Sequence, residues 1–175
     1  LGRIREELHN ANGFSWQNWV AAAQYALQVK RPNDALEFAD RAINFQFVGQ
    51  ENFQTLSTLA TAQEAAGKTA EAKATREKAW AHQTASVIDL HQAGRQLLAQ
   101  GKKEDALRIW ELNAKRYPNQ WPTHVGLARG YSAAGRYKDG LKEAKLALAQ
   151  APDDVNRKSL EAGIKKLEAG TDMNQ

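Results

Sequence analysis

The sequence of 175 residues has no cysteine, only four prolines and one methionine, and no long run of apolar residues. The missing cysteines exclude disulfides, thiolate nucleophiles and thiolate metal ligands. They leave the compartment open, because disulfide-free proteins occur in reducing and in oxidising spaces. A membrane-spanning helix needs about 20 consecutive apolar residues, and the longest apolar patches, such as residues 19–23, are far shorter. The sequence therefore predicts no direct insertion into a membrane.

The sequence signatures of common enzyme classes are also missing. There is no phosphate-binding Walker loop, no glycine-rich dinucleotide fingerprint and no glycine-flanked nucleophilic serine. The carboxylates are dispersed along the chain, so no pair stands out for acid–base work. The sequence therefore predicts no catalytic residue, no cofactor and no enzymatic activity.

The four histidines, at positions 9, 82, 91 and 124, give little support for a metal site. None lies three or four residues from another, the spacing that places two ligands on one face of a helix. His91 and His124 would lie on neighbouring helices and are the one pair to consider, but two unrelated polar side chains are the favoured interpretation. We expect no metal site.

The excess of positive charge is confined to the second half of the chain. Residues 1–87 carry nine basic and nine acidic side chains, whereas residues 88–175 carry fifteen and eleven. Because the two signs are interleaved, a solvated helical face is favoured over a nucleic-acid footprint. Tryptophans could stack on bases, but Trp19 and Trp110 fall at positions expected in a core. We expect no nucleic-acid partner.

A regular repeat organises the second part of the chain. Gly67, Gly101 and Gly135 share one local setting at a constant 34-residue interval, and the same interval separates Pro118 from Pro152. A small residue five positions after each glycine repeats as well. Independent markers in one register indicate a helical repeat architecture.

The first repeat follows the same pattern with a shift. A longer, 37-residue interval separates its small residue, Ala35, from the next one, Ala72. We place the three extra residues in the loop around 48–51, where an insertion disturbs no helix. Lys30 stands at the glycine position, and Pro32 suits the first turn of a new helix.

Between these markers apolar residues recur every three or four positions, which is typical of helices with one buried face. The predicted helices span residues 15–29, 32–46, 51–66, 69–82, 86–100, 103–116, 121–134, 137–150 and 153–168. They give four hairpin repeats and a cap, at about 15–50, 51–86, 87–120, 121–152 and 153–170, followed by a tail, 171–175. We expect residues 1–14 to be a linker or the end of a missing upstream domain, because the chain begins with Leu1 and not Met.

The repeat resembles that of the tetratricopeptide family. The fourth repeat carries the fullest set of matching residues: Leu127, Ala128, Tyr131, Gly135, Tyr137, Gly140, Ala147 and Pro152. Asn113 and Thr84 depart from the family pattern in the third and second repeats. The resemblance implies an all-α fold, an α–α superhelix of four helical hairpins with a C-terminal capping helix. It also implies a protein-interaction module whose partner is a protein or peptide.

A second, weaker likeness is to the C-terminal repeats of a family of bacterial envelope proteins that have an upstream domain of unknown function. It rests on Trp16 with Trp19, the loop 47–49, and the run 119–122. This likeness implies a periplasmic or envelope-associated location in preference to the cytoplasm.

In the tetratricopeptide family the first helix of each hairpin lines a concave groove that binds the partner. Carried over to this sequence, the lining comprises Gln17, Val20, Gln24, Ser57, Thr58, Thr61, Glu64, His91, Gln92, Arg95, Val125, Arg129 and Ser132. Arg95 and Arg129 are separated by one full 34-residue repeat, so we expect them side by side, able to hold a carboxylate through paired, charge-assisted hydrogen bonds.

Two other interpretations remain open from the sequence. The repeats could brace an upstream domain or form a homodimer through the loop aromatics Phe45, Phe47 and Phe53. Alternatively, they could recruit substrate for an enzyme whose catalytic domain is not part of this sequence. A protein-interaction module with a polar groove is favoured over both.

Overall fold

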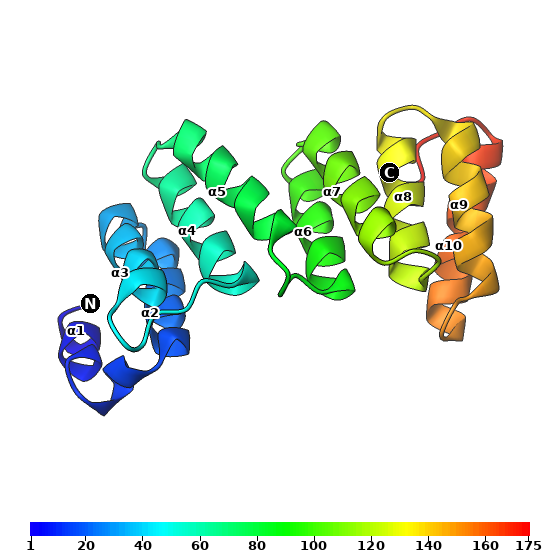
Figure 1. Ribbon diagram of the computed structural model, residues 1–175. Helices are drawn as coiled ribbons and strands as arrows, with labels where there is room; N and C mark the ends of the chain where they lie inside the picture. Colours follow the sequence, from blue (N-terminus) through cyan, green and yellow to red (C-terminus); the bar gives the residue numbers. More distant parts are fainter. The chain divides into compact units, whose positions relative to one another are not determined.

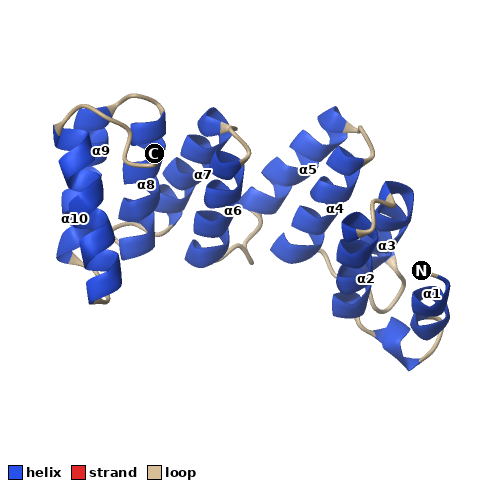
Figure 2. Cartoon of the chain, turned by 180° about the vertical axis from the view of Figure 1, so that it is seen from behind, coloured by secondary structure: helices blue, strands red, loops and turns tan.

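The chain is entirely helical in the residues that the structure describes, as the sequence predicts. The structure is a computed structural model that describes residues 1–175 except for the side chain of Ala11, and these residues contain no strand (Figure 2). The chain divides into two compact units, residues 1–85 and 86–175. This division falls between the second and third predicted repeats.

The first unit holds two helical hairpins preceded by a short helix (Figure 1). Its elements are α1 (Gly2–Leu8), the 3-10 helix η1 (Ala11–Phe14), α2 (Trp16–Gln28), α3 (Pro32–Asn44), α4 (Phe53–Ala65) and α5 (Thr69–Ala81). Helix α2 packs against α3 and α4 against α5, while α3 also contacts α4. These contacts stack the two hairpins on each other.

The second unit repeats this arrangement and adds a final helix (Figure 1). Its elements are α6 (Val87–Ala99), α7 (Lys103–Arg116), α8 (Trp121–Ala133), α9 (Tyr137–Ala149) and α10 (Asp154–Glu168). Helix α10 packs against α9 as the predicted cap. Every helix of both units that belongs to a hairpin lies within two residues of its predicted bounds.

The turns inside the hairpins share one backbone conformation. Gly67, Gly101 and Gly135 have φ values of +79°, +76° and +74°, a left-handed region that glycine enters without steric cost. Lys30 occupies the same place in the first hairpin, with φ of +58°. The predicted equivalence of Lys30 and the three glycines therefore holds in the backbone, although a side chain makes this turn more strained.

The connection between α3 and α4 is longer than that between α5 and α6. It spans residues 45–52, whereas residues 82–86 join α5 to α6, three residues fewer. The longer connection ends in a capping box, in which Asn52 accepts a hydrogen bond from the Thr55 amide at 3.0 Å. The insertion predicted from the 37-residue interval is thus accommodated outside the helices.

The core of the first unit is built largely from alanine. Its alanines on α2, α3 and α4 are almost wholly buried: Ala22, Ala23, Ala26, Ala35, Ala39, Ala42 and Ala62. Trp19 and Phe38 fill the space around them, with ring centroids 6.1 Å apart. Small side chains allow the helix axes to approach closely, which is why the aromatic groups lie around the contacts and not within them.

In the second unit a single tryptophan lies against three glycines. Trp110 on α7 is completely buried. A Cβ atom added at Gly94 on α6 would lie 2.3 Å from its ring, and one added at Gly126 or Gly130 on α8 would lie 2.5 or 2.9 Å from it. The indole therefore occupies space that any side chain at these positions would fill.

Helix α1 is fastened to the first hairpin by a network of charges. The Arg5 guanidinium donates hydrogen bonds to Asp34 at 2.6 Å and to Glu37 at 2.7 and 2.9 Å, and it lies 4.9 Å from the centroid of the Phe38 ring. Leu8 is buried in the same core. Part of the segment predicted as a linker thus packs on α2 and α3.

Candidate functional site

The first helices of the four hairpins, α2, α4, α6 and α8, each contain 13 residues. Their ninth residues are Gln24, Thr61, Arg95 and Arg129. Within each unit the two first helices contact each other, α2 with α4 and α6 with α8. The ninth position is therefore equivalent in all four helices, and two of its occupants are arginines in the second unit.

The predicted groove residues fall into two sets, one on each unit, and each set is described by itself. In the first unit Gln17, Gln24 and Thr61 are exposed, and in the second unit Gln92 and Arg95 are exposed. Ser57, Glu64 and Arg129 are half-buried. These side chains form the accessible part of the predicted lining.

The remaining predicted lining residues lie beneath the surface, which corrects the prediction at those positions. Val20 and Val125 are core residues. Thr58 is buried, and its hydroxyl donates to the Gln54 carbonyl one turn earlier, at 2.9 Å. His91 and Ser132 are 7% and 1% exposed. Spacing along a helix selects a face, but the depth of each position depends on the neighbouring helices, which spacing does not reveal.

Arg95 and Arg129 are close enough to affect each other electrostatically. The pKa of the Arg129 guanidinium is lowered, first because the group is largely removed from water and second because the positive charge of Arg95 is nearby. Arg129 Nη1 donates one hydrogen bond, at 3.3 Å, to the neutral Asn174 Oδ1. The two arginines therefore lie within electrostatic range of each other, on helices α6 and α8, which are in contact.

Most arginines in the chain have a carboxylate within salt-bridge distance. Those with such a partner include Arg3, Arg5, Arg31, Arg41, Arg76, Arg108, Arg136 and Arg157. Arg95 and Arg129 have no carboxylate at this distance among the described residues. Guanidinium groups bind carboxylates through charge-assisted hydrogen bonds, which is the chemistry that these two side chains offer.

His91 on α6 is buried within electrostatic range of both arginines and is neutral at physiological pH. Burial, aided by the charges of Arg95 and Arg129, lowers its pKa to about 4, against the opposing effect of a hydrogen bond to the Pro122 carbonyl. Since a carbonyl can only accept, the Nδ1–H of His91 donates to it, at 2.9 Å. The ring thus links α6 to α8 as a structural group.

His124, the other member of the candidate metal pair, is engaged elsewhere. Its Nδ1 lies 2.7 Å from Glu143 Oε2 and its Nε2 lies 3.2 Å from Asn119 Oδ1. No group of three or more His, Asp or Glu side chains in the described part of the chain is arranged to hold a metal ion. Both ring nitrogens of His124 and the Nδ1 of His91 are therefore bonded to other groups, and the two rings have no partner in common.

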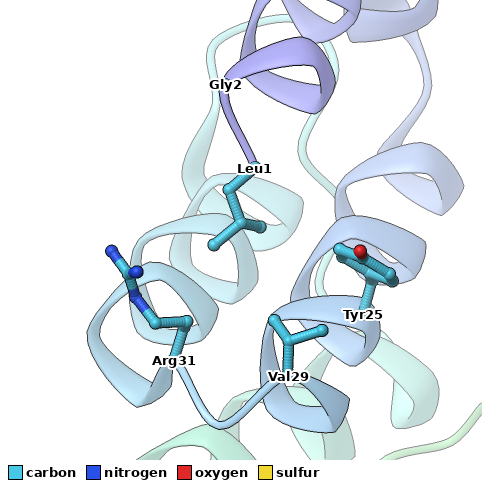
Figure 3. Close-up of a pocket in the computed structure, with 5 residues that line it drawn as sticks. All are labelled: Leu1, Gly2, Tyr25, Val29 and Arg31. Carbon is cyan, nitrogen blue, oxygen red and sulfur yellow. The ribbon is translucent and has the colours of Figure 1, made fainter.

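The first unit contains two cavities that sequence reasoning did not anticipate. One, of about 460 Å³, is lined by Leu1, Gly2, Tyr25, Val29 and Arg31 (Figure 3). The other, of about 320 Å³, is lined by Ile4, Glu7, Leu8, Asn12, Asn18, Ala21, Ala22 and Tyr25. Both lie beside α1 and include Tyr25, and neither contains a predicted groove residue.

The structure also places the C-terminal residues at a position that no pattern in the sequence indicates. In both overall views the end of the chain lies beside α8 (Figures 1 and 2). Ser132 donates to Asp172 Oδ1 at 2.7 Å, and Asn174 bonds to Arg129. The sequence contains only a short polar tail after a helix-ending glycine, with no periodicity that would indicate where it docks.

None of the described helices combines the length and the apolar character that crossing a bilayer requires.

Comparison with models of known protein families finds no match. Comparison with the curated proteins also finds none. Among solved structures, a tetratricopeptide repeat protein from Parabacteroides merdae ATCC 43184 is similar, with a TM-score of 0.60 and 17% sequence identity. The match covers 88% of this chain and 60% of that protein. The fold is of the tetratricopeptide type. This tetratricopeptide fold is the one that the 34-residue repeat predicts, and the chain spans about 60% of the length of its structural neighbour.

Proposed function

We propose that this tetratricopeptide-type chain is a non-catalytic module that binds a peptide or a partner domain. Arg95 and Arg129 of the second unit hold a carboxylate of that partner. The observation that supports this proposal is a pair of neighbouring guanidinium groups with no carboxylate beside either of them among the described residues. Repeat folds of this kind present the surfaces of successive first helices to other polypeptides, which fits the position of the pair on α6 and α8.

An isolated pair of like charges on a folded protein is unfavourable unless an anion joins it. Removing Arg129 from water adds to this cost, as the lowered pKa of its guanidinium indicates. A bound carboxylate would offset both effects and accept charge-assisted hydrogen bonds from the two guanidinium groups. The site is therefore best suited to an Asp or Glu side chain or to a chain-terminal carboxylate.

The first unit supplies the matched variant for testing this. Because Gln24 and Thr61 occupy the equivalent ninth positions, Arg95→Thr with Arg129→Gln replaces the pair by residues that the fold already carries there. The two proteins would be used to select from a displayed library of random decapeptides. We expect the wild-type chain to enrich sequences rich in Asp and Glu, and the variant to lose this enrichment.

The control removes two positive charges elsewhere on the same unit. Lys138→Thr with Lys142→Gln, on the exposed side of α9, makes the same change in net charge and should leave the selection unaltered. If the arginine variant selects the same acidic peptides as the wild type, or if the wild type selects none, the proposed site is wrong.

One observation favours dimerisation as a second candidate function. Phe47 lies in the connection between α3 and α4, where its backbone φ is +64° and its side chain is 97% exposed. Phe45, by contrast, contacts Trp19 at a ring-centroid distance of 5.6 Å. Sedimentation equilibrium would distinguish the candidates: a dimer that Phe47→Ser converts to a monomer supports the structural role, and a monomer at all concentrations excludes it.

A further inference from the structure

After α10 the chain reverses direction and returns to α8. Gly170, with φ of +72°, ends the helix: its amide donates to the Leu167 carbonyl at 3.0 Å, and the Thr171 amide donates to the Lys166 carbonyl at 2.9 Å. This pair of hydrogen bonds is the usual way in which a glycine stops a helix and turns the chain. Residues 171–175, called the tail below, therefore leave α10 in a defined direction.

The tail is fixed to α8 through Ser132. The Ser132 hydroxyl donates to Asp172 Oδ1 at 2.7 Å and accepts a hydrogen bond from the Met173 amide at 2.9 Å. Burial alone would raise the pKa of the Asp172 carboxyl, but the hydrogen bonds from Ser132 and Asn174 outweigh it and hold the pKa below its usual value. A buried serine thus uses both its donor and its acceptor on the tail.

Asn174 makes a two-way contact with Arg129. Its Nδ2 donates to the Arg129 carbonyl at 3.0 Å, and its Oδ1 accepts from Arg129 Nη1 at 3.3 Å. Between these polar contacts, the Met173 side chain packs with Ile164 and Leu167. It also occupies the space above Gly163, because a Cβ atom added at that glycine would lie 2.7 Å from the terminal methyl group of Met173. The tail thus has an acidic, an apolar and an amide anchor in succession.

These contacts occupy part of the surface to which the proposed function assigns the partner. The tail offers Arg129 a neutral amide and not a carboxylate, since the Asp172 carboxylate is taken up by Ser132 and Asn174. A carboxylate adds the attraction of opposite charges and can accept two parallel hydrogen bonds from one guanidinium, which a neutral amide oxygen does not. A peptide that brings a carboxylate to Arg129 would therefore form the stronger contact with this group.

We propose that the tail is an intramolecular occupant of the Arg95–Arg129 surface, which an acidic peptide segment must displace in order to bind. This inference rests on the proposed function, because it concerns the same arginines. A tethered segment acts at an effective concentration in the millimolar range, so that even weak contacts compete well with a free ligand. The tail thus lowers the affinity for acidic peptides and excludes those that cannot replace its contacts.

The test uses the full chain and a fluorescein-labelled hexaglutamate peptide as the probe, with binding followed by fluorescence anisotropy. Asp172→Ala with Asn174→Ala removes the polar anchors of the tail and leaves Arg95, Arg129 and Ser132 intact. We expect this variant to bind the probe about tenfold more tightly than the wild type, because the intramolecular competitor is lost. Glu161→Ala, which removes one negative charge from the exposed side of α10, is the control and should bind like the wild type.

A second measurement monitors the tail itself. The Met173 amide, which donates to Ser132, should exchange slowly with solvent in the free wild-type chain, and saturating hexaglutamate should accelerate its exchange. Unchanged slow exchange with the probe bound would show that the tail is not displaced, and rapid exchange in the free chain would show that it is not docked. Either result overturns the inference.

The outcomes also separate this inference from the proposed function. If wild type and tail variant bind the probe equally, and Arg95→Thr with Arg129→Gln abolishes binding, the arginine site stands and the competing tail is wrong. If neither the wild type nor the tail variant binds the probe, both are wrong for acidic peptides.

Discussion

The two units contain equivalent pairs of hairpins but differ in the charges on their first helices. Helix α2 has no ionisable acidic or basic side chain apart from Tyr25, and on α4 the one charged residue, Glu64, is paired with Arg76. In the second unit Arg95 and Arg129 have no such partner among the described residues. The same scaffold thus carries a neutralised surface on one unit and an uncompensated positive one on the other, so anion recognition is expected in the second unit.

The units differ in their cores as well. The first is assembled from alanines with Trp19 and Phe38 around them, whereas the second encloses Trp110 between the glycines of α6 and α8. The second unit also buries aliphatic side chains such as Leu90, Ile109 and Leu160, and Trp110 is larger than any of them. Removing this one side chain should therefore affect the second unit more strongly than truncating any of the others.

The largest expected effect is that of Trp110→Ala. Deleting a fully buried aromatic side chain costs roughly 3–5 kcal/mol, because the cavity that remains is only partly filled by relaxation. We expect hydrogen exchange to accelerate in residues 86–175 and to change little in residues 1–85. Gly2→Ala, which adds a methyl group where nothing lies within 4 Å, is the neutral control. Equal acceleration in both units would mean that they unfold together, contrary to the comparison.

The next effect is a dependence of stability on pH that originates in the second unit. The unfolded chain protonates His91 near its ordinary pKa of 6.5, whereas the folded chain does so near 4, with Arg95 and Arg129 opposing the charge. The contribution of neutral His91 to the free energy of unfolding is therefore fully present above about pH 6.5. It is lost as the pH falls toward 4, which lowers the free energy of unfolding by about 3 kcal/mol at most.

Urea denaturation at several pH values measures this loss. His91→Asn should flatten the curve between pH 6.5 and 4, while His9→Asn, at an exposed position, should retain the wild-type curve. An unchanged pH dependence in the His91 variant would show that the histidine is not the group responsible.

A smaller effect distinguishes paired from unpaired arginines directly. Arg5→Met removes a guanidinium bonded to Asp34 and Glu37 and should cost roughly 1 kcal/mol. Arg129→Met removes a partly buried charge without a carboxylate partner, and we expect no loss of stability or a gain of up to about 1 kcal/mol. Urea midpoints at low salt give both values. If Arg129→Met were as destabilising as Arg5→Met, Arg129 would be a structural residue.

The smallest effect concerns the turns. Lys30→Gly relieves a left-handed conformation that costs a non-glycine residue about 1 kcal/mol, so the melting temperature of the first unit should rise slightly. Gly101→Lys, at the equivalent turn of the second unit, should lower stability by a similar amount. Calorimetry of both variants measures the difference. A fall in stability on Lys30→Gly would show that the lysine side chain contributes a contact that outweighs the strain.

Much of the fold was accessible from the sequence because it depends on local spacing. The constant 34-residue interval between the glycines located the turns, and the longer interval between Ala35 and Ala72 located the insertion. The neighbourhood of Arg95 and Arg129 also follows from the repeat length. A location in the periplasm or envelope, expected from the weaker resemblance, stays a prediction.

The parts that could not be predicted depend on contacts between distant segments. Burial of His91 and Ser132 depends on how deeply α6 and α8 lie against their neighbours, and the docking of the tail depends on a chain reversal after Gly170. The role of Arg5 is similar, because its partners at positions 34 and 37 follow from the packing of α1 on α3. None of these has a periodic signature.

The shared ninth position of the first helices has a consequence for how such a protein changes over generations. Its four occupants, Gln24, Thr61, Arg95 and Arg129, are absent from the alanine and glycine contacts that hold the hairpins together. A mutation there can alter what the surface attracts while the scaffold keeps its packing. Under the proposed function, binding preference and folding can change independently at this position, so that duplicated repeats can diverge in their partners without first having to acquire a new fold.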